Sequence, residues 1–121
     1  MAVILVVEDD EANQELVTRF LKRSGHQVLL ATDGIGGVKA ALEHVPDLIV
    51  MDLGLPGLDG WEAAQRIKSS PRTARVPIIA LTAHTLSDDV KKAVAAGIDA
   101  FETKPVVYHR LMRRLRTLIE D

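Results

Sequence analysis

The chain has 121 residues, 47% hydrophobic and 26% charged, so we expect one packed domain over residues 1–121 rather than a disordered chain. Its formal net charge of -2 gives no general attraction to nucleic acid or to an anionic membrane, and no apolar run approaches the roughly 20 residues of a membrane span. The absence of cysteine excludes disulfides, thiol catalysis and zinc–thiolate sites.

Short apolar runs alternate with helical patterns along the chain. In chain order they predict a strand at 2–7, a helix at 11–23, a strand at 27–31, a helix at 35–44, a strand at 47–51, a helix at 60–69, a strand at 77–81, a helix at 87–96, a strand at 99–102 and a helix at 106–119. This repeat predicts an α/β fold with a five-stranded parallel sheet in the flavodoxin-like order 2-1-3-4-5 and helices on both faces. The first apolar run is too short for a signal peptide and is followed directly by acidic residues. We therefore expect a cytoplasmic protein.

Carboxylates follow two of the predicted strands. Glu8, Asp9 and Asp10 come directly after the first strand, and Asp52 ends the apolar run at 47–51. Parallel strands end at one edge of the sheet, where ligands bind, so we expect these carboxylates to lie together. A hard cation relieves their mutual repulsion, and few protein ligands beside open water favour Mg²⁺ over Ca²⁺. The sequence therefore predicts a magnesium site at this edge.

Two other polar residues follow the last two predicted strands. Thr82 offers a hydroxyl and Lys104 offers an ammonium. A metal ion, an ammonium and a hydroxyl together suit the oxygens of a phosphoryl group. Because a carboxylate can be the attacking nucleophile, we expect Asp52 to form an aspartyl-phosphate.

Four segments, ILVVEDD, MDLGLPGLDG, ALTAH and FETKP, together resemble the receiver domain of two-component response regulators over essentially the whole chain. The resemblance implies that Asp52 is the phosphoacceptor. It implies that Asp9 binds Mg²⁺ directly, that Glu8 acts through water and that Gly54 contributes its backbone carbonyl. Asp10 follows the usual acidic pair and is the less favoured ligand.

The resemblance also implies roles around the phosphoryl group. Thr82 is similar to the switch hydroxyl of the family, Lys104 to its phosphoryl-binding lysine and Phe101 to its switch aromatic. The Lys104–Pro105 bond matches a cis peptide of the family. His84 stands at a position that tunes dephosphorylation in the family, which leaves the lifetime of the phosphoryl group open.

Phosphorylation-controlled signalling is the function that this resemblance implies. A histidine kinase or a histidine phosphotransfer protein would donate the phosphoryl group to Asp52, and the surface of the helix at 87–96, the strand at 99–102 and the helix at 106–119 would then change its contacts with a downstream protein. The chain would catalyse its own phosphorylation and dephosphorylation without being a conventional enzyme. It would act as a stand-alone regulator, a relay intermediate or a receiver of a larger hybrid kinase.

Two alternative functions belong to other classes. A Mg²⁺-dependent phosphatase that forms an aspartyl-phosphate is disfavoured, because such enzymes usually carry a second aspartate at the position of Gly54. A scaffold that is never phosphorylated is the other alternative. Labelling with acetyl phosphate and Mg²⁺ distinguishes both from a receiver.

Two surfaces are expected to bind partners. The phosphodonor is expected to contact Asn13, Gln14, Val17 and Val106. On the last helix, one apolar stripe, Val107, Leu111, Leu115 and Leu118, is expected to face the sheet. A second stripe with Tyr108 and Met112 either packs under neighbouring helices or anchors phosphorylation-dependent association with a second copy or an acidic downstream protein. Direct binding of nucleic acid is not expected.

Overall fold

The computed structural model describes residues 1–55, 57–83, 91–92 and 95–119. Within them, one parallel sheet runs in the order β2-β1-β3-β4-β5, formed by β1 (Val3–Val7), β2 (Gln27–Ala31), β3 (Leu48–Asp52), β4 (Ile78–Thr82) and β5 (Ala100–Thr103). The helices are α1 (Glu11–Arg23), α2 (Gly34–His44), α3 (Gly60–Ser69) and α5 (Tyr108–Ile119). The predicted fold class and strand order are confirmed, whereas the predicted helix at 87–96 lies largely outside the described residues.

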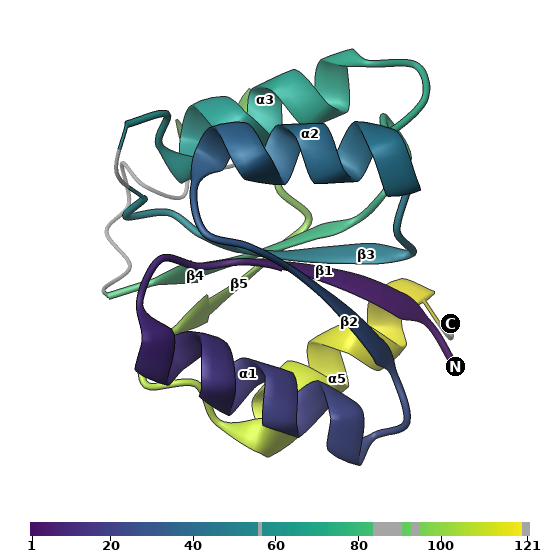
Figure 1. Cartoon of the computed structure of the whole chain (residues 1–121), viewed down its shortest axis with the longest axis vertical. Coiled ribbons are helices and arrows are strands. Elements are labelled where there is room, and N and C mark those ends of the chain that lie inside the picture. Colours follow the sequence, from purple (N-terminus) through teal and green to yellow (C-terminus); the bar gives the residue numbers. More distant parts are fainter. Residues whose placement is uncertain (56, 84–90, 93–94, 120–121) are drawn as a thin grey trace.

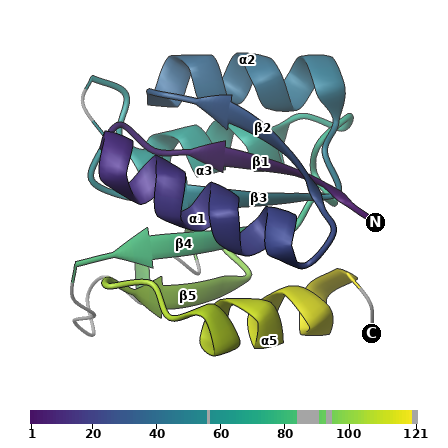
Figure 2. The ribbon, with the colours of Figure 1, turned by 60° about the horizontal axis from the view of Figure 1, so that its bottom comes forward.

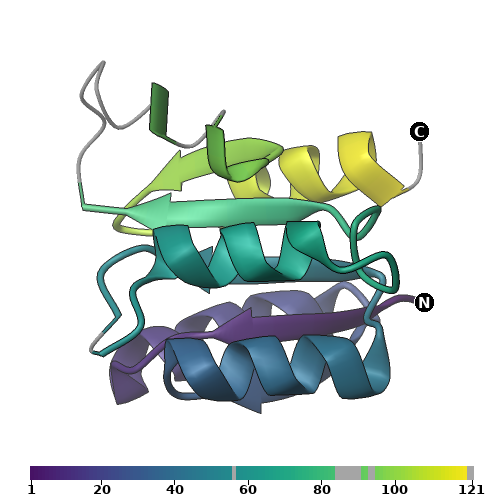
Figure 3. The ribbon, with the colours of Figure 1, turned by 90° about the horizontal axis from the view of Figure 1, so that it is seen from above.

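Helices cover both faces of the sheet (Figure 1). Figure 2 shows α1 and α5 on one face, and Figure 3 shows α2 and α3 on the other. Every residue of β3 and β4 is buried, because both strands lie inside the sheet and beneath helices. Burial on both faces explains why these strands read as continuous apolar runs instead of alternating. In the described part of the chain, no helix combines the length and the apolar character of a membrane span.

Three helices begin at an aspartate that caps the first turn. Asp10 accepts a hydrogen bond from the backbone N–H of Asn13 at 2.9 Å, and Asp59 accepts one from Glu62 at 2.9 Å. Asp33 does the same for α2. Each cap satisfies an N–H group that has no partner within the helix, which is typically worth about 1 kcal/mol. The caps therefore fix where each turn after a strand becomes a helix.

The start of α3 lies directly against the end of β3. A Cβ atom on Gly60 would overlap the backbone oxygen of Asp52 and would lie 2.7 Å from the Cα of Leu53. Only a residue without a side chain allows this approach. The first turn of α3 is consequently held beside the residue that ends β3.

The two apolar stripes of α5 differ from their prediction. Leu111 and Leu115 are buried as expected, but Val107 precedes the helix and is 41% exposed. Met112 is only 6% exposed, and Tyr108 packs its ring edge-on against Phe20 of α1, with a centroid distance of 5.3 Å. Met112 is thus nearly buried and Tyr108 half-buried, because α1 packs against this stripe, as the packing alternative predicts. Association through Tyr108 and Met112 stays a prediction.

Two arginines of α5 pair within the chain. Arg110 Nε lies 3.2 Å from Glu102 Oε1, and Arg114 Nε donates to Glu102 Oε2 at 2.8 Å. Glu102 is a β5 residue and is only 7% exposed. Part of the basic surface of α5 is thus compensated by a buried carboxylate of the sheet.

Replacing Gly60 by alanine should destabilise the protein by about 1–3 kcal/mol, the usual cost of overpacking, because the added methyl group meets backbone that cannot move aside. Gly54→Ala is the matched control, since in the described part of the chain its Cβ would meet only the Asp52 carboxylate, at 3.8 Å. Urea unfolding without Mg²⁺ measures both variants. Equal midpoints for Gly60→Ala and the wild type would contradict the close contact between α3 and β3.

Candidate functional site

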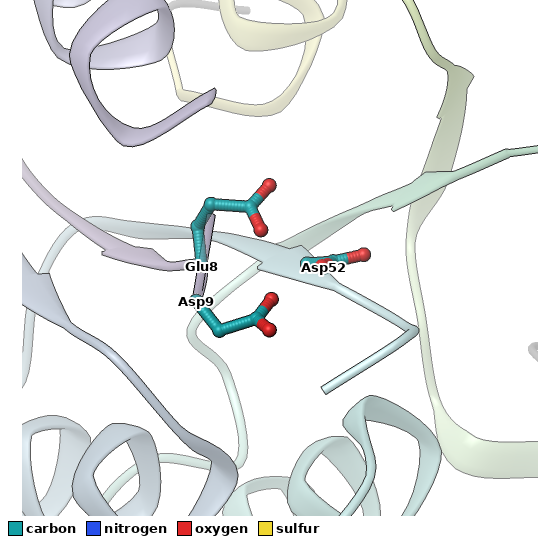
Figure 4. Close-up of side chains that lie close together, drawn as sticks. All are labelled: Glu8, Asp9 and Asp52. Carbon is teal, nitrogen blue, oxygen red and sulfur yellow. The ribbon is translucent and has the colours of Figure 1, made fainter. Parts of the chain in front are cut away.

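Three carboxylates meet at the carboxyl edge of the sheet (Figure 4). β1 and β3 are neighbours, with Val7 paired to Met51, so the residues that follow this pair emerge side by side. Oxygen atoms of Glu8, Asp9 and Asp52 lie within 4.8 Å of one another. The predicted convergence of carboxylates from these two strands is present in the fold.

Lys104 lies between two of these carboxylates. Its Nζ atom is 3.3 Å from Glu8 Oε1 and 3.3 Å from Asp52 Oδ1. The backbone N–H of Lys104 donates to the carbonyl of Thr82 at 2.8 Å, which holds the end of β5 against β4. The Lys104–Pro105 peptide bond is cis, as predicted. The one ammonium of Lys104 therefore forms ion pairs with two acidic side chains, which lie at the ends of different strands.

Burial and crowding change the affinity of these groups for protons. Burial of Glu8, together with its hydrogen bond to Asp52, raises the pKa of Glu8 from 4.5 to about 7. Burial alone would lower the pKa of Lys104, but attraction to Asp52 and Glu8 outweighs it and raises that pKa. The ammonium of Lys104 therefore stays charged, whereas the positive charge near Glu8 is too small to offset the burial of its carboxylate.

The acidic cluster opens into a pocket of about 430 Å³. Its lining consists of Glu8, Asp9, Asp10, Asp52, Leu53, Gly54, Trp61, Thr82, Ala83 and Lys104. Within it, the backbone N–H of Gly54 donates to Asp52 Oδ1 at 3.1 Å, which orients that carboxylate. The pocket thus holds acidic, basic and hydroxyl groups within reach of one small ligand.

The residues of this pocket suit a hard divalent cation. Glu8 is fully buried, and its Oε1 atom accepts no well-formed hydrogen bond among the described residues, although Lys104 Nζ lies 3.3 Å away. Asp9 is exposed, so one side of the cluster is open to water. Carboxylate oxygens beside open water match the preference of Mg²⁺, which keeps several waters when it binds to proteins.

Most predicted site residues lie around the pocket. Thr82 ends β4 and is buried, and Phe101 is half-buried one strand away. Asp10 lines the pocket, but its carboxylate caps α1 and it does not belong to the metal-binding group of Glu8, Asp9 and Asp52. Predicted His84 lies outside the described residues.

The predicted docking surface needs a correction. Val17 is completely buried and Val106 is 6% exposed, because both pack in the core between the sheet, α1 and α5. Val17 offers no surface to a phosphodonor, so that expectation is wrong for Val17, whereas contact through the small exposed part of Val106 stays a prediction. Asn13 and Gln14 are half-buried near the pocket, and Gln14 Nε2 donates to the carbonyl of Glu8 at 2.6 Å.

Three residues of the pocket lining, Leu53, Trp61 and Ala83, were not predicted from the sequence, and Trp61 is the bulkiest of them. Trp61 belongs to the first turn of α3 and lines the acidic pocket from that side. Its position one residue after Gly60 could have indicated this placement, because Gly60 allows the helix to approach Asp52. The helical pattern alone did not show which face of this short helix meets the strand ends.

Comparisons with known proteins agree with this geometry. A family model described as the response regulator receiver domain matches residues 4–116. The transcriptional regulator RpaA of Synechocystis is 38% identical over 98% of this chain and 49% of its own length, and the regulator AfsQ1 of Streptomyces coelicolor is 40% identical over 98% and 52%. The chain thus spans about half the length of these two relatives. DivK of Brucella anthropi is 30% identical over 98% of this chain and 96% of its own.

Solved structures show the same likeness. The receiver domain of the sensor histidine kinase PA1611 from Pseudomonas aeruginosa, with a magnesium ion coordinated in its active site cleft, has a TM-score of 0.92 and 38% identity, covering 99% of this chain and 98% of that one. CheY4 of Vibrio cholerae has a TM-score of 0.93 and 25% identity, covering 98% of each chain. With its family match, fold and acidic pocket taken together, this chain belongs to the response regulator receiver domains of two-component signalling.

Proposed function

We propose that Asp52 accepts a phosphoryl group from a phosphohistidine of a histidine kinase or a histidine phosphotransfer protein. The observation that supports this most is the contact of Lys104 with Asp52, inside a pocket that also contains Glu8, Asp9 and Thr82. A nucleophile, an ammonium and a hydroxyl then line one pocket, which is the set of groups that phosphoryl transfer to a carboxylate needs.

The side chains divide the transfer among them. An oxygen of Asp52 attacks phosphorus, the new O–P bond forms, and the P–N bond to the donor imidazole breaks, with its electron pair returning to that ring. Lys104 stabilises the negative charge on the transferred oxygens, and the hydroxyl of Thr82 donates to one of them. Mg²⁺ held by Glu8, Asp9, Asp52 and the carbonyl of Gly54 would neutralise the remaining oxygen charge.

Signalling follows from the position of Lys104. It joins the pocket to β5 and, through Pro105, to the start of α5. A new bond between Lys104 and a phosphoryl oxygen would compete with its present contacts to Glu8 and Asp52. We infer that this exchange shifts the population of β5 and α5 arrangements that a downstream protein recognises.

Incubation with acetyl phosphate and Mg²⁺ should add one phosphoryl group to the protein, detected by intact mass, and Asp52→Asn should remove this labelling. Asp9→Asn should weaken the labelling strongly, because it removes the negative charge of an exposed metal ligand. Asp10→Asn is the matched control: asparagine caps a helix as well as aspartate, and labelling should persist. Equal labelling of the Asp9 and Asp10 variants would contradict the assigned metal cluster.

The metal-free protein should lose stability as pH rises from about 4.5 to about 7, because the pKa of Glu8 moves between these values on folding and the folded state holds the proton more tightly. Glu8→Gln removes the buried charge. It should therefore be more stable than the wild type at pH 8 and lose this advantage near pH 4. Urea unfolding at both pH values measures the difference, and a difference that does not depend on pH would count against the buried, charge-poor carboxylate.

A further inference from the structure

Trp61 forms one wall of the pocket that contains Asp52. It belongs to the first turn of α3, which lies over the central strands (Figure 3) and is capped by Asp59. Gly60 brings the backbone of that turn against the backbone of Asp52. The indole is thus attached to a part of the helix whose distance from the phosphoacceptor is fixed.

Two contacts from other segments hold the indole. Its ring lies edge-on to Phe101, with centroids 6.5 Å apart and an interplanar angle of 63°. The Nζ atom of Lys92 lies 5.8 Å from the indole centroid. Both values fall within the ranges of favourable aromatic pairs and cation–π contacts. The orientation of Trp61 therefore depends on β5 and on the segment that carries Lys92, as well as on its own helix.

Among the described lining residues, the apolar side chains other than Trp61 are aliphatic and smaller. Gly54 has no side chain, and among the described residues a Cβ atom there would find only the Asp52 carboxylate within 4 Å. Leu53 and Ala83 are the aliphatic residues of the lining, and Trp61 is its one aromatic residue among the described residues. Among the described lining residues, the indole is consequently the largest apolar side chain.

We propose that Trp61 restricts the access of water to phosphorylated Asp52, and that Lys92 is a positioning residue that acts through the indole. The proposal rests on the proposed function, since it concerns the lifetime of the aspartyl-phosphate. In the reaction that is slowed, a water oxygen bonds to phosphorus, the bond between phosphorus and the Asp52 oxygen breaks, and its electrons return to the carboxylate. Inorganic phosphate leaves, and one proton of the water passes to solvent.

The test measures loss of the phosphoryl group after labelling with acetyl phosphate and Mg²⁺ and removal of the reagent, followed by intact mass over time. Trp61→Ala should shorten the lifetime most, and Trp61→Phe should restore part of it by replacing the apolar wall. Lys92→Ala should shorten it about two- to fivefold, the rate equivalent of one exposed cation–π contact. Lys91→Ala is the matched control, because Lys91 has no aromatic contact among the described residues and should leave the lifetime unchanged.

Two further readouts separate positioning from a general effect on folding. The double variant of Trp61→Ala with Lys92→Ala should decay no faster than Trp61→Ala alone, because Lys92 acts only through the indole. Trp61 is the single tryptophan of the chain, so acrylamide quenching of its fluorescence should increase in Lys92→Ala and not in Lys91→Ala. The melting temperatures of the two lysine variants should be equal.

The outcomes distinguish this inference from the function on which it rests. A wild-type protein that takes up no phosphoryl group overturns both. A labelled wild type whose lifetime matches that of Trp61→Ala overturns the shielding role and leaves the receiver function intact. Equal lifetimes and equal quenching in the two lysine variants overturn the positioning role of Lys92.

Discussion

One ammonium shared by two acidic side chains governs this site. Lys104 contacts both Glu8 and Asp52 at 3.3 Å, in a place where Glu8 is fully buried and Asp52 nearly so. A single positive charge cannot compensate two desolvated carboxylates and the neighbouring Asp9. A bound cation among these carboxylates is therefore stabilising. The same arrangement of charges suits the oxygens of a phosphoryl group on Asp52.

The rest of the fold keeps these charges together. Parallel pairing of β1 with β3 and of β4 with β5 brings the residues that end these strands to one edge, so their approach does not depend on flexible loops. The caps at Asp10 and Asp59 and the close contact at Gly60 then fix the turns that surround the edge. The pairing of the strands therefore holds the carboxylates of Glu8, Asp9 and Asp52 together in spite of their mutual repulsion.

The sequence was sufficient for the architecture and for the acidic edge because both follow from strand periodicity. A buried run that ends in Asp52 must place that carboxylate at the sheet edge, and the same reasoning applies to Glu8 and Thr82. Surfaces were harder to predict. Val17 was expected to contact a phosphodonor, and Met112 was left as either packed or accessible, because helical spacing defines only which residues share a face. The direction of that face is set by the packing of α1 on α5. Trp61 was missed for the same reason, since its neighbours Phe101 and Lys92 are far from it in sequence.

Locating the phosphorylated residue tests the central claim most directly. Borohydride reduces an aspartyl-phosphate to homoserine, so reduction of the acetyl phosphate-labelled protein followed by peptide mass spectrometry marks the acceptor. We expect homoserine at position 52 and unmodified Glu8 and Asp9, because Asp52 combines the contact to Lys104, which Glu8 shares, with a hydrogen bond from the N–H of Gly54 that orients it. Reduction at another carboxylate, or at none, would contradict the account.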